Sequence, residues 1–217
     1  MRLGKGVVAV ATAISVQVAA IGWLVWRYEH VVQYGEEVRL KCRAYDPYDP
    51  LRGRYLDVTV IDSCTNILFE VDADSPWRSS KSKMFAKLVE SPNSGGIYRV
   101  EAVAHEPTDD GLWVRTSRVR LDFALGYENR RKNEPWEAFE RRRAASGVEA
   151  AVHFPGCLFI DERIAPTAED LLSKDPKTAV AVYRVLDGRI VLVDIEQSGK
   201  PVLSAARAAL GKKGKGK

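Results

Sequence analysis

An apolar run close to the N-terminus constrains this chain more than any other feature. Between Val7 and Trp26 the only strongly polar side chain is Gln17. A helix of about 20 residues, rising about 1.5 Å per residue, spans the roughly 30 Å hydrocarbon core of a bilayer. Trp23 and Trp26 lie at the far end of the run, where indole rings favour the membrane interface. We therefore predict a transmembrane anchor over residues 7–26, in contact with the lipid bilayer.

The short segment before the anchor predicts its orientation. Residues 1–6 carry Arg2, Lys5 and the terminal amine, and basic segments of this kind stay in the cytoplasm. A cleaved signal peptide ending near Ala20 is the alternative, but apolar sequence continues past that site, whereas signal-peptide cores typically stop at about 7–15 residues. We therefore expect an uncleaved anchor followed by a spacer over 27–36, an extracytoplasmic domain over 37–204 and a terminal segment with a disordered basic tail over 205–217.

The distribution of charge argues against a nucleic-acid partner. The formal net charge is +4, and much of it comes from the last residues, Lys212, Lys213, Lys215 and Lys217. Nucleic-acid binding would require a basic stripe with aromatic side chains on a folded face. A low-complexity Gly-Lys tail does not supply one. We expect no nucleic acid among the partners.

No residue spacing in the chain predicts a metal or a cofactor. The three cysteines form no Cys-x-x-Cys pair, and His105 and His153 have no neighbouring Cys or His. A catalytic zinc ion usually has three protein ligands. We expect no metal and no cofactor, and we interpret the cysteines as small buried apolar residues: Cys42, Cys64 and Cys157.

Alternating apolar and polar residues predict strands through much of the domain. Residues 38–44 and 55–60 alternate in this way, as half-buried strands require. The two runs are predicted to pair across residues 45–55 as an antiparallel hairpin. In a regular register, Cys42 and Cys64 then lie too far apart for a disulfide.

Two further hairpins are predicted along the chain. Residues 98–105 and 113–123 alternate and are joined by a turn sequence rich in Pro, Asp and Gly. Residues 179–186 and 189–196 flank Asp187-Gly188, which is typical of a two-residue type I′ turn. Both pairs are therefore expected to lie side by side as antiparallel neighbours.

Short helices complete the predicted fold. Helical spacing occurs within residues 128–145, 161–172 and 202–210, and residues 151–159 are predicted as strand. Arg141-Arg142-Arg143 is interpreted as a solvated helix face near a helix C-terminus, where cations are favoured. We therefore predict an α+β or mainly β fold: an N-terminal transmembrane helix followed by an antiparallel hairpin domain with two or three short helices.

In one connection between predicted strands, the residue types restrict the backbone conformation more than in the others. Residues 45–55 read YDPYDPLRGRY. Each proline fixes its own φ at about −65° and favours extended geometry for the aspartate before it, and glycine permits positive φ. We interpret the connection as a rigid loop that either determines the hairpin register or contacts a partner; the candidate residues are Asp46, Pro47, Asp49, Pro50, Arg52, Gly53 and Tyr55.

This connection resembles a segment of the membrane-anchored GDYXXLXY family. The family's name motif aligns with residues 53–60, in which Gly53 and Tyr55 fit. Three other motif positions differ, since the family's Asp, Leu and Tyr are replaced by Arg54, Val58 and Val60. A second segment, residues 159–169, is also similar to a recurring segment of the family, through Asp161, Glu162, Pro166 and Glu169. The resemblance implies an N-terminally anchored, extracytoplasmic protein of the bacterial inner membrane, without an established activity.

Clusters of acidic and Ser/Lys residues raise an enzymatic alternative. Acidic residues gather at Asp46, Asp49, Asp57 and Asp62, and a serine and lysine group occurs at Ser79, Ser80, Lys81, Ser82 and Lys83. Aspartate serves turns routinely, and the serines lack a nucleophile motif. We therefore predict no catalytic residue and a domain that binds a polytopic membrane protein or another envelope partner. An envelope hydrolase with an acidic or Ser/Lys site is the alternative.

Overall fold

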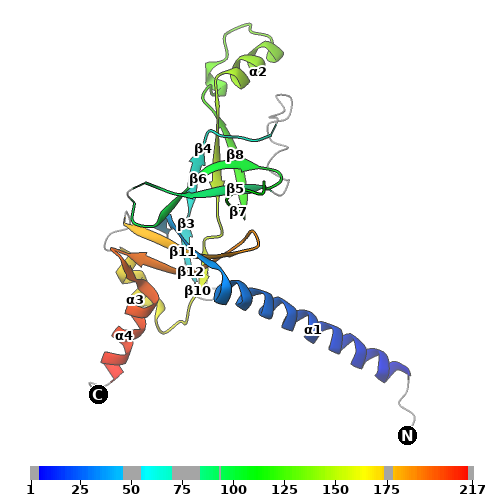
Figure 1. Cartoon of the computed structure of the whole chain (residues 1–217), viewed down its shortest axis with the longest axis vertical. Coiled ribbons are helices and arrows are strands. Elements are labelled where there is room, and N and C mark those ends of the chain that lie inside the picture. The colour runs from blue at the N-terminus through cyan, green and yellow to red at the C-terminus, as the bar shows by residue number, and fades with distance from the viewer. Residues whose placement is uncertain (1–4, 46–54, 70–83, 93, 174–177, 215–217) are drawn as a thin grey trace.

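The N-terminal helix stands apart from the rest of the fold. Helix α1 (Lys5–Tyr34) projects from the domain, and its contacts with the described part of the domain lie near its end, where Val31 is buried (Figure 1). The helix is long and apolar enough over Ala9–Tyr34 to cross a membrane. The predicted anchor at 7–26 is helical, and the predicted spacer continues the same helix as far as Tyr34. The computed structural model describes residues 5–45, 55–69, 84–92, 94–173 and 178–214.

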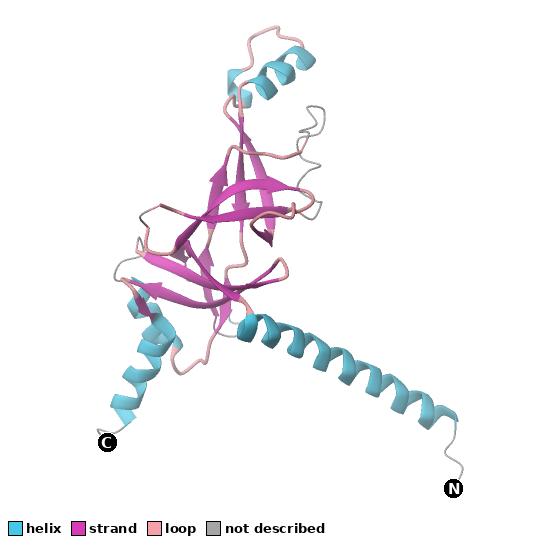
Figure 2. Ribbon diagram, in the orientation of Figure 1, coloured by secondary structure: helices cyan, strands magenta, loops and turns pink. Residues whose placement is uncertain are grey.

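Beyond α1 the chain is mostly strand (Figure 2). The largest sheet has seven strands in the order β13-β12-β11-β1-β6-β5-β7, and its paired strands are antiparallel except for β1 and β6. Its strands are β1 (Glu36–Lys41), β5 (Phe85–Glu90), β6 (Ile97–Ala104), β7 (Leu112–Arg115), β11 (Ala179–Leu186), β12 (Arg189–Gln197) and β13 (Lys200–Pro201).

Two three-stranded antiparallel sheets complete the strand framework. Their orders are β10-β3-β2 and β4-β9-β8. Their strands are β2 (Arg43–Tyr45), β3 (Tyr55–Thr59), β4 (Ile61–Cys64), β8 (Arg118–Phe123), β9 (Val148–His153) and β10 (Cys157–Phe159).

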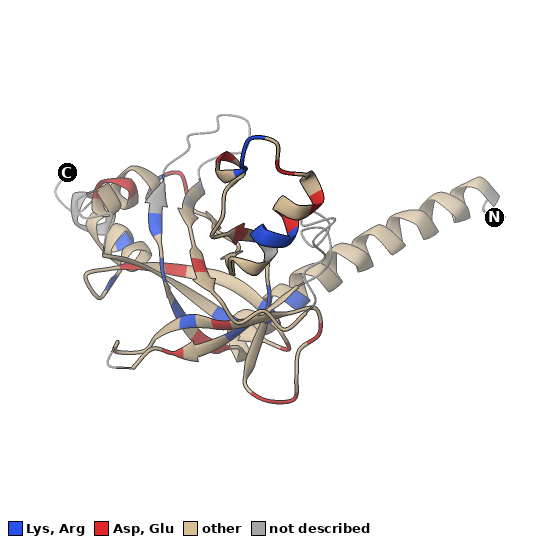
Figure 3. Cartoon of the chain, turned by 90° about the horizontal axis from the view of Figure 1, so that it is seen from above, with Lys and Arg blue, Asp and Glu red and all other residues tan. Residues whose placement is uncertain are grey.

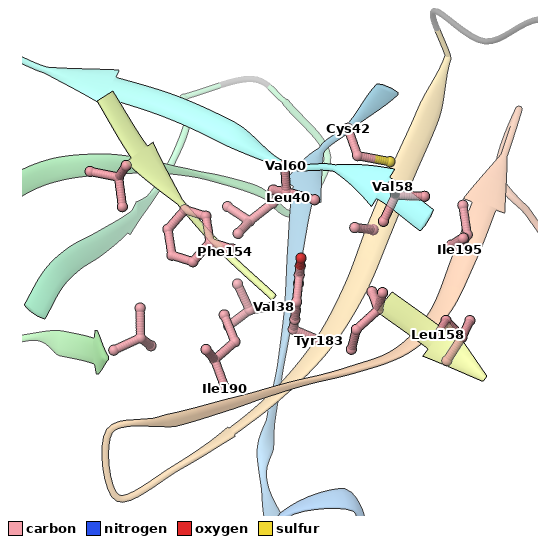
Figure 4. Packing of buried hydrophobic residues seen from close by; sticks show 14 of the residues in the cluster. Val38, Leu40, Cys42, Val58, Val60, Phe154, Leu158, Tyr183, Ile190 and Ile195 are labelled. Carbon is pink, nitrogen blue, oxygen red and sulfur yellow. The ribbon is translucent and has the colours of Figure 1, made fainter. Parts of the chain in front are cut away.

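Bent strands join the three sheets around one core. β1 passes into β2 at Cys42, β3 into β4 at Val60, and β7 into β8 at Thr116-Ser117. Bends of this kind make corners where a strand switches sheets. Buried residues from all three sheets consequently pack together, around Tyr183, whose hydroxyl donates a 2.7 Å hydrogen bond to the Pro155 carbonyl (Figure 4).

Two helices cover the side of the domain opposite α1. Helices α3 (Ala165–Ser173) and α4 (Val202–Gly214) contact each other there (Figure 1). Ala168 and Ala206 are both fully buried, and such small residues let helices approach closely. Two further helices, η2 (Tyr127–Asn129) and α2 (Trp136–Ala145), lie between β8 and β9 in the chain.

The predicted fold class and the hairpin at Asp187-Gly188 are confirmed, and the hairpin between residues 38–44 and 55–60 is confirmed in part. The fold is α+β with mostly antiparallel strands after the apolar helix. β2 and β3 pair antiparallel, with Tyr45 opposite Asp57. The first run divides at Cys42, however, and its earlier part is β1, which pairs with β11 and β6 in another sheet. β11 and β12 meet at Asp187 and Gly188, whose φ values of 50° and 73° are the left-handed values that a type I′ turn requires.

The predicted hairpin between residues 98–105 and 113–123 is wrong. β5 lies between β6 and β7 and pairs with both. The second run is also two strands, because it bends at Thr116-Ser117 into a different sheet. Residues 151–159 likewise divide at residues 154–156 into β9 and β10. Alternation identifies which side chains face a core, but it does not identify the neighbouring strand.

The cysteines follow the prediction at two of three positions. Cys42 and Cys64 are buried thiols without a disulfide, and burial raises their pKa values to about 12 and about 11. Cys157 is exposed on β10, so its predicted burial is wrong. Neighbouring side chains of a strand point to opposite faces, and in this short strand the inward-facing side chain is that of Leu158.

Candidate functional site

Most of the predicted candidate loop lies outside the described residues. This holds for Asp46, Pro47, Asp49, Pro50, Arg52 and Gly53, and for the Ser/Lys group at Ser79, Ser80, Lys81, Ser82 and Lys83. Tyr55 is the first residue of β3. The structure therefore locates the strands on both sides of the connection, β2 and β3.

The second segment of the family resemblance lies directly beside β3. β10 pairs antiparallel with β3, so that Phe159 is opposite Tyr55 and Leu158 is opposite Leu56. The two similar segments, separated by about a hundred residues, are thus brought together at one sheet. Local sequence patterns predict neither this proximity nor the pairing of β10 with β3 that produces it.

Asp161, in the second segment, has structural partners. The Asp161 carboxylate accepts hydrogen bonds from the Arg163 guanidinium, the shorter at 2.7 Å, and from the Arg163 backbone N–H, which lower its pKa to about 2. The Asp161 carbonyl accepts from the backbone N–H of Ile164 at the start of α3. Glu162 is exposed, and Pro166 and Glu169 lie within α3. The segment thus forms a turn that starts a helix.

The described residues contain no group of three His, Cys, Asp or Glu side chains that could hold a metal ion. Asp62 instead joins two sheets, because its carboxylate accepts a 2.7 Å hydrogen bond from the Val100 backbone N–H. His153 lies in β9 with its Nε2 buried and without a hydrogen-bond partner. Burial and then Arg118 lower the pKa of His153, which favours the neutral ring.

A separate candidate site lies in the segment that connects β8 to β9. We call residues 124–147 the α2 tip; it contains η2 and α2 and lies at the end of the domain away from α1 (Figure 1). The last strand pair below it is Phe123 with Val148. The tip is the long connection between two paired strands, β8 and β9. Its ordered structure therefore depends mainly on contacts between its own residues.

Arg143 is the centre of the α2 tip. Its guanidinium carbon lies 4.1 Å from the ring centroid of Phe123 and 4.0 Å from that of Tyr127. Its Nη1 donates a 2.7 Å hydrogen bond to the Tyr127 hydroxyl and lies 3.5 Å from the Glu140 carboxylate. Its Nε donates to the Leu125 carbonyl at 3.2 Å. The predicted solvated face is therefore wrong for Arg143, which is only 6 % exposed.

Arg142 also departs from that prediction. It is half-buried and pairs with Glu134 through Nε and Nη2 at 3.0 and 2.8 Å. Glu134 in turn accepts from the backbone N–H of Arg131 at 3.1 Å. These contacts close the loop that precedes α2. Of the three arginines, only Arg141 is exposed as predicted.

Two aromatic rings are held at the surface of the tip. Trp136 and Tyr127 stack with centroids 5.9 Å apart and an interplanar angle of 4°, and they remain 52 % and 40 % exposed. Phe139 lies beneath them, fully buried, and the Arg130 guanidinium lies 5.4 Å from the Trp136 ring centroid. Residues of both charge signs occur along the α2 tip (Figure 3). Exposed Trp, Tyr and Arg side chains with fixed positions are typical of binding hot spots.

Acid is expected to destabilise the α2 tip. The midpoint pH of this transition should lie far below the pKa of an ordinary glutamate. The Arg142 hydrogen bonds lower the pKa of Glu134 from 4.5 to about 2. A carboxylate whose pKa falls on folding stabilises fully above its unfolded pKa, and this contribution is lost as the pH falls through its folded pKa. The NMR signal of the Trp136 indole N–H should therefore shift between about pH 4.5 and about pH 2.

The matched variant for this titration is Glu134→Gln, which removes the ionisable group. Its Trp136 signal should lack the acid transition altogether. A wild-type midpoint close to pH 4.5 would contradict the close pairing of Glu134 with Arg142.

The fold and the tip together define a class of protein: an α+β domain attached to one N-terminal helix that is long and apolar enough to cross a membrane. Within that class the chain belongs to the GDYXXLXY family, whose model, described as GDYXXLXY protein, matches residues 17–203. The match includes most of α1, the candidate loop, the second similar segment and the α2 tip, and it confirms the predicted family. No curated protein and no solved structure matches the chain.

Proposed function

We propose that this protein is a single-pass protein of the bacterial inner membrane whose extracytoplasmic domain binds an envelope or membrane partner through the α2 tip. Its role is recognition rather than catalysis. The observation that carries the proposal is the exposed Trp136–Tyr127 pair, which is fixed in position by the buried Arg143. A surface that is ordered before binding loses little conformational entropy on binding.

The chemistry around the pair favours a particular kind of partner. The exposed charged side chains near the pair are mostly positive. The positive ones are Arg130, Arg131, Lys132 and Arg141, and the negative ones are Glu128 and Glu137. The other charged side chains of the tip are paired internally, as Arg142 with Glu134 and Arg143 with Glu140. A protein segment with apolar side chains flanked by carboxylates would match this surface.

The location of the tip supports the same proposal. α1 joins the domain at one end, and the tip lies at the other (Figure 1). With residues 1–6 in the cytoplasm and residues 7–26 in the bilayer, the tip would face away from the anchor. The predicted loop at Asp46 to Gly53 is the competing contact surface, and the experiment below separates the two.

The test is photo-crosslinking in the native membrane with a crosslinking amino acid at Tyr127, at Leu51 in the candidate loop, and at Leu68 as a control. Leu68 is 50 % exposed and lies outside both surfaces. We expect one defined protein adduct from Tyr127 only. The same adduct from Leu51 and not from Tyr127 would assign recognition to the loop and overturn the role of the tip.

The Trp136→Ala variant measures the contribution of the surface. Removing a hot-spot tryptophan costs about 2 kcal/mol or more of binding free energy, so the affinity for the crosslinked partner should fall about 30-fold. Because Trp136 is half exposed, the melting temperature should change little. Leu68→Ala is the matched control and should retain the affinity. An unchanged affinity in Trp136→Ala would exclude the tip as the contact surface.

A further inference from the structure

A groove lies where α1 meets the domain, and neither the proposed partner surface nor the family similarity accounts for it. Its volume is about 680 Å³, which is within the range of about 300–1,000 Å³ common to small-molecule sites. Leu24 and Val31 of α1 line it on one side, and Ile190 of β12 lines it on the other. The groove is therefore apolar and continuous with the helix that carries the apolar run.

Three arginines surround this apolar surface. Arg27 comes from α1, Arg115 from the end of β7 and Arg189 from the start of β12, and all three line the groove with exposed side chains. The backbone N–H of Arg115 donates a 2.7 Å hydrogen bond to the carbonyl of Gly188, which holds the two domain arginines close in the fold. Three arginines from α1, β7 and β12, which are distant in sequence, thus place their positive charges around the same groove.

These charges lack compensation within the described part of the chain. No ion pair there joins Arg27, Arg115 or Arg189 to a carboxylate, whereas Arg39, Arg142 and Arg163 all have such partners. Like charges that gather without a counter-charge repel one another. A bound anion would relieve that repulsion, and guanidinium groups match phosphate oxygens particularly well.

We propose that the groove binds an anionic phospholipid of the bilayer that contains α1. The phosphate lies among Arg27, Arg115 and Arg189, and an acyl chain follows the apolar surface past Leu24. Leu24 belongs to the apolar run and is 62 % exposed, so the groove opens onto the part of α1 that faces lipid. This inference rests on the proposed function in one respect, the insertion of α1 in a membrane.

Charge and shape together decide between a lipid and a soluble anion. A free phosphate would use the arginines but would leave the apolar surface in water. An uncharged lipid would cover that surface and would leave three positive charges uncompensated. Only an amphiphile with a negative headgroup satisfies both parts of the groove.

The experiment measures lipid binding to the full chain in detergent by native mass spectrometry. Phosphatidylglycerol and phosphatidylcholine of equal chain length are titrated separately. We expect phosphatidylglycerol to bind at least tenfold more tightly. The double variant Arg115→Gln/Arg189→Gln should weaken phosphatidylglycerol binding about 30-fold, on the scale of membrane attraction per basic residue. Arg99→Gln is the charge control, because Arg99 is exposed on β6 and does not line the groove.

Three outcomes would overturn the proposal. Equal affinity for the two lipids would exclude recognition of the headgroup charge. Equal losses in the double variant and in Arg99→Gln would exclude this groove. Release of the bound lipid by millimolar inorganic phosphate would assign a free-anion site instead.

A membrane assay distinguishes these failures from failure of the proposed function. An alkaline phosphatase fusion at the C-terminus and carbonate extraction report whether α1 anchors the chain. If the chain is anchored but shows no lipid preference, only the lipid site is wrong. If the chain is released by carbonate, the membrane-anchored function itself is wrong.

Discussion

Replacing Arg143 by alanine is expected to destabilise the α2 tip by about 3 kcal/mol, because removing one partner of a buried ion pair leaves the other charge uncompensated. Glu140 would lose its only ion pair among the described residues, and the Tyr127 hydroxyl would lose its donor. Both rings that sandwich the guanidinium, Phe123 and Tyr127, would lose contacts of about 4 Å. Hydrogen exchange should therefore accelerate through residues 124–147.

The measurement compares Arg143→Ala with Arg141→Ala in hydrogen exchange and in urea unfolding. Arg141 lies two residues away on the same helix and is exposed, and among the described residues it makes only a 3.4 Å hydrogen bond to the Glu137 carbonyl. Its loss should change stability by less than about 0.5 kcal/mol. Because the tip makes most of its contacts within itself, exchange should rise there before it rises in β8 and β9. Equal protection in the two variants would show that the buried arginine does not organise the tip.

Replacing Gly35 by alanine is expected to displace α1 from the domain at a cost of about 3 kcal/mol. Gly35 lies between α1 and β1, and a Cβ there would be 2.9 Å from the backbone nitrogen of Val185 and 3.0 Å from its carbonyl oxygen. Val185 lies in β11, which pairs with β1 immediately beside this point. Backbone atoms of a central strand cannot move aside as a flexible side chain would, so the helix must shift.

Gly22→Ala is the matched control, since a Cβ at Gly22 meets nothing within 4 Å. The two variants can be compared by thermal unfolding in detergent and by chymotrypsin cleavage after Tyr34. Gly35→Ala should lower the melting temperature by about 6–12 °C, the shift that corresponds to this loss for a domain of this size, and should speed cleavage. A cleavage rate equal to that of Gly22→Ala would contradict a close helix–strand contact.

The sequence predicts which residues are buried better than it predicts which strands are neighbours. Val38, Leu40 and Val58 are all buried, as their alternation requires. Hairpins were predictable where a turn of specific chemistry joins consecutive strands, as at Asp187-Gly188. The pairing of β1 with β11, and its parallel pairing with β6, depend on segments far away in the chain and leave no local pattern.

The candidate site was partly predictable for the same reason. Helical spacing puts Phe139 and Arg143 four residues apart, on one face of α2. That spacing could have identified Arg143 as an inward-facing residue beside Trp136 and Phe139. Spacing could not identify the two rings that contact the Arg143 guanidinium, because Phe123 comes from β8 and Tyr127 from η2.

The position of β1 also determines when the domain can be completed during synthesis. β1 follows α1 directly, whereas Arg184, which donates to the Gly35 carbonyl, comes 149 residues later. At about 5–20 residues per second, the ribosome needs roughly 7–30 seconds to supply that partner. Until then β1 has no antiparallel neighbour, and such long-range pairing is slow in its own right. The anchor is thus made first but is docked among the last parts of the fold.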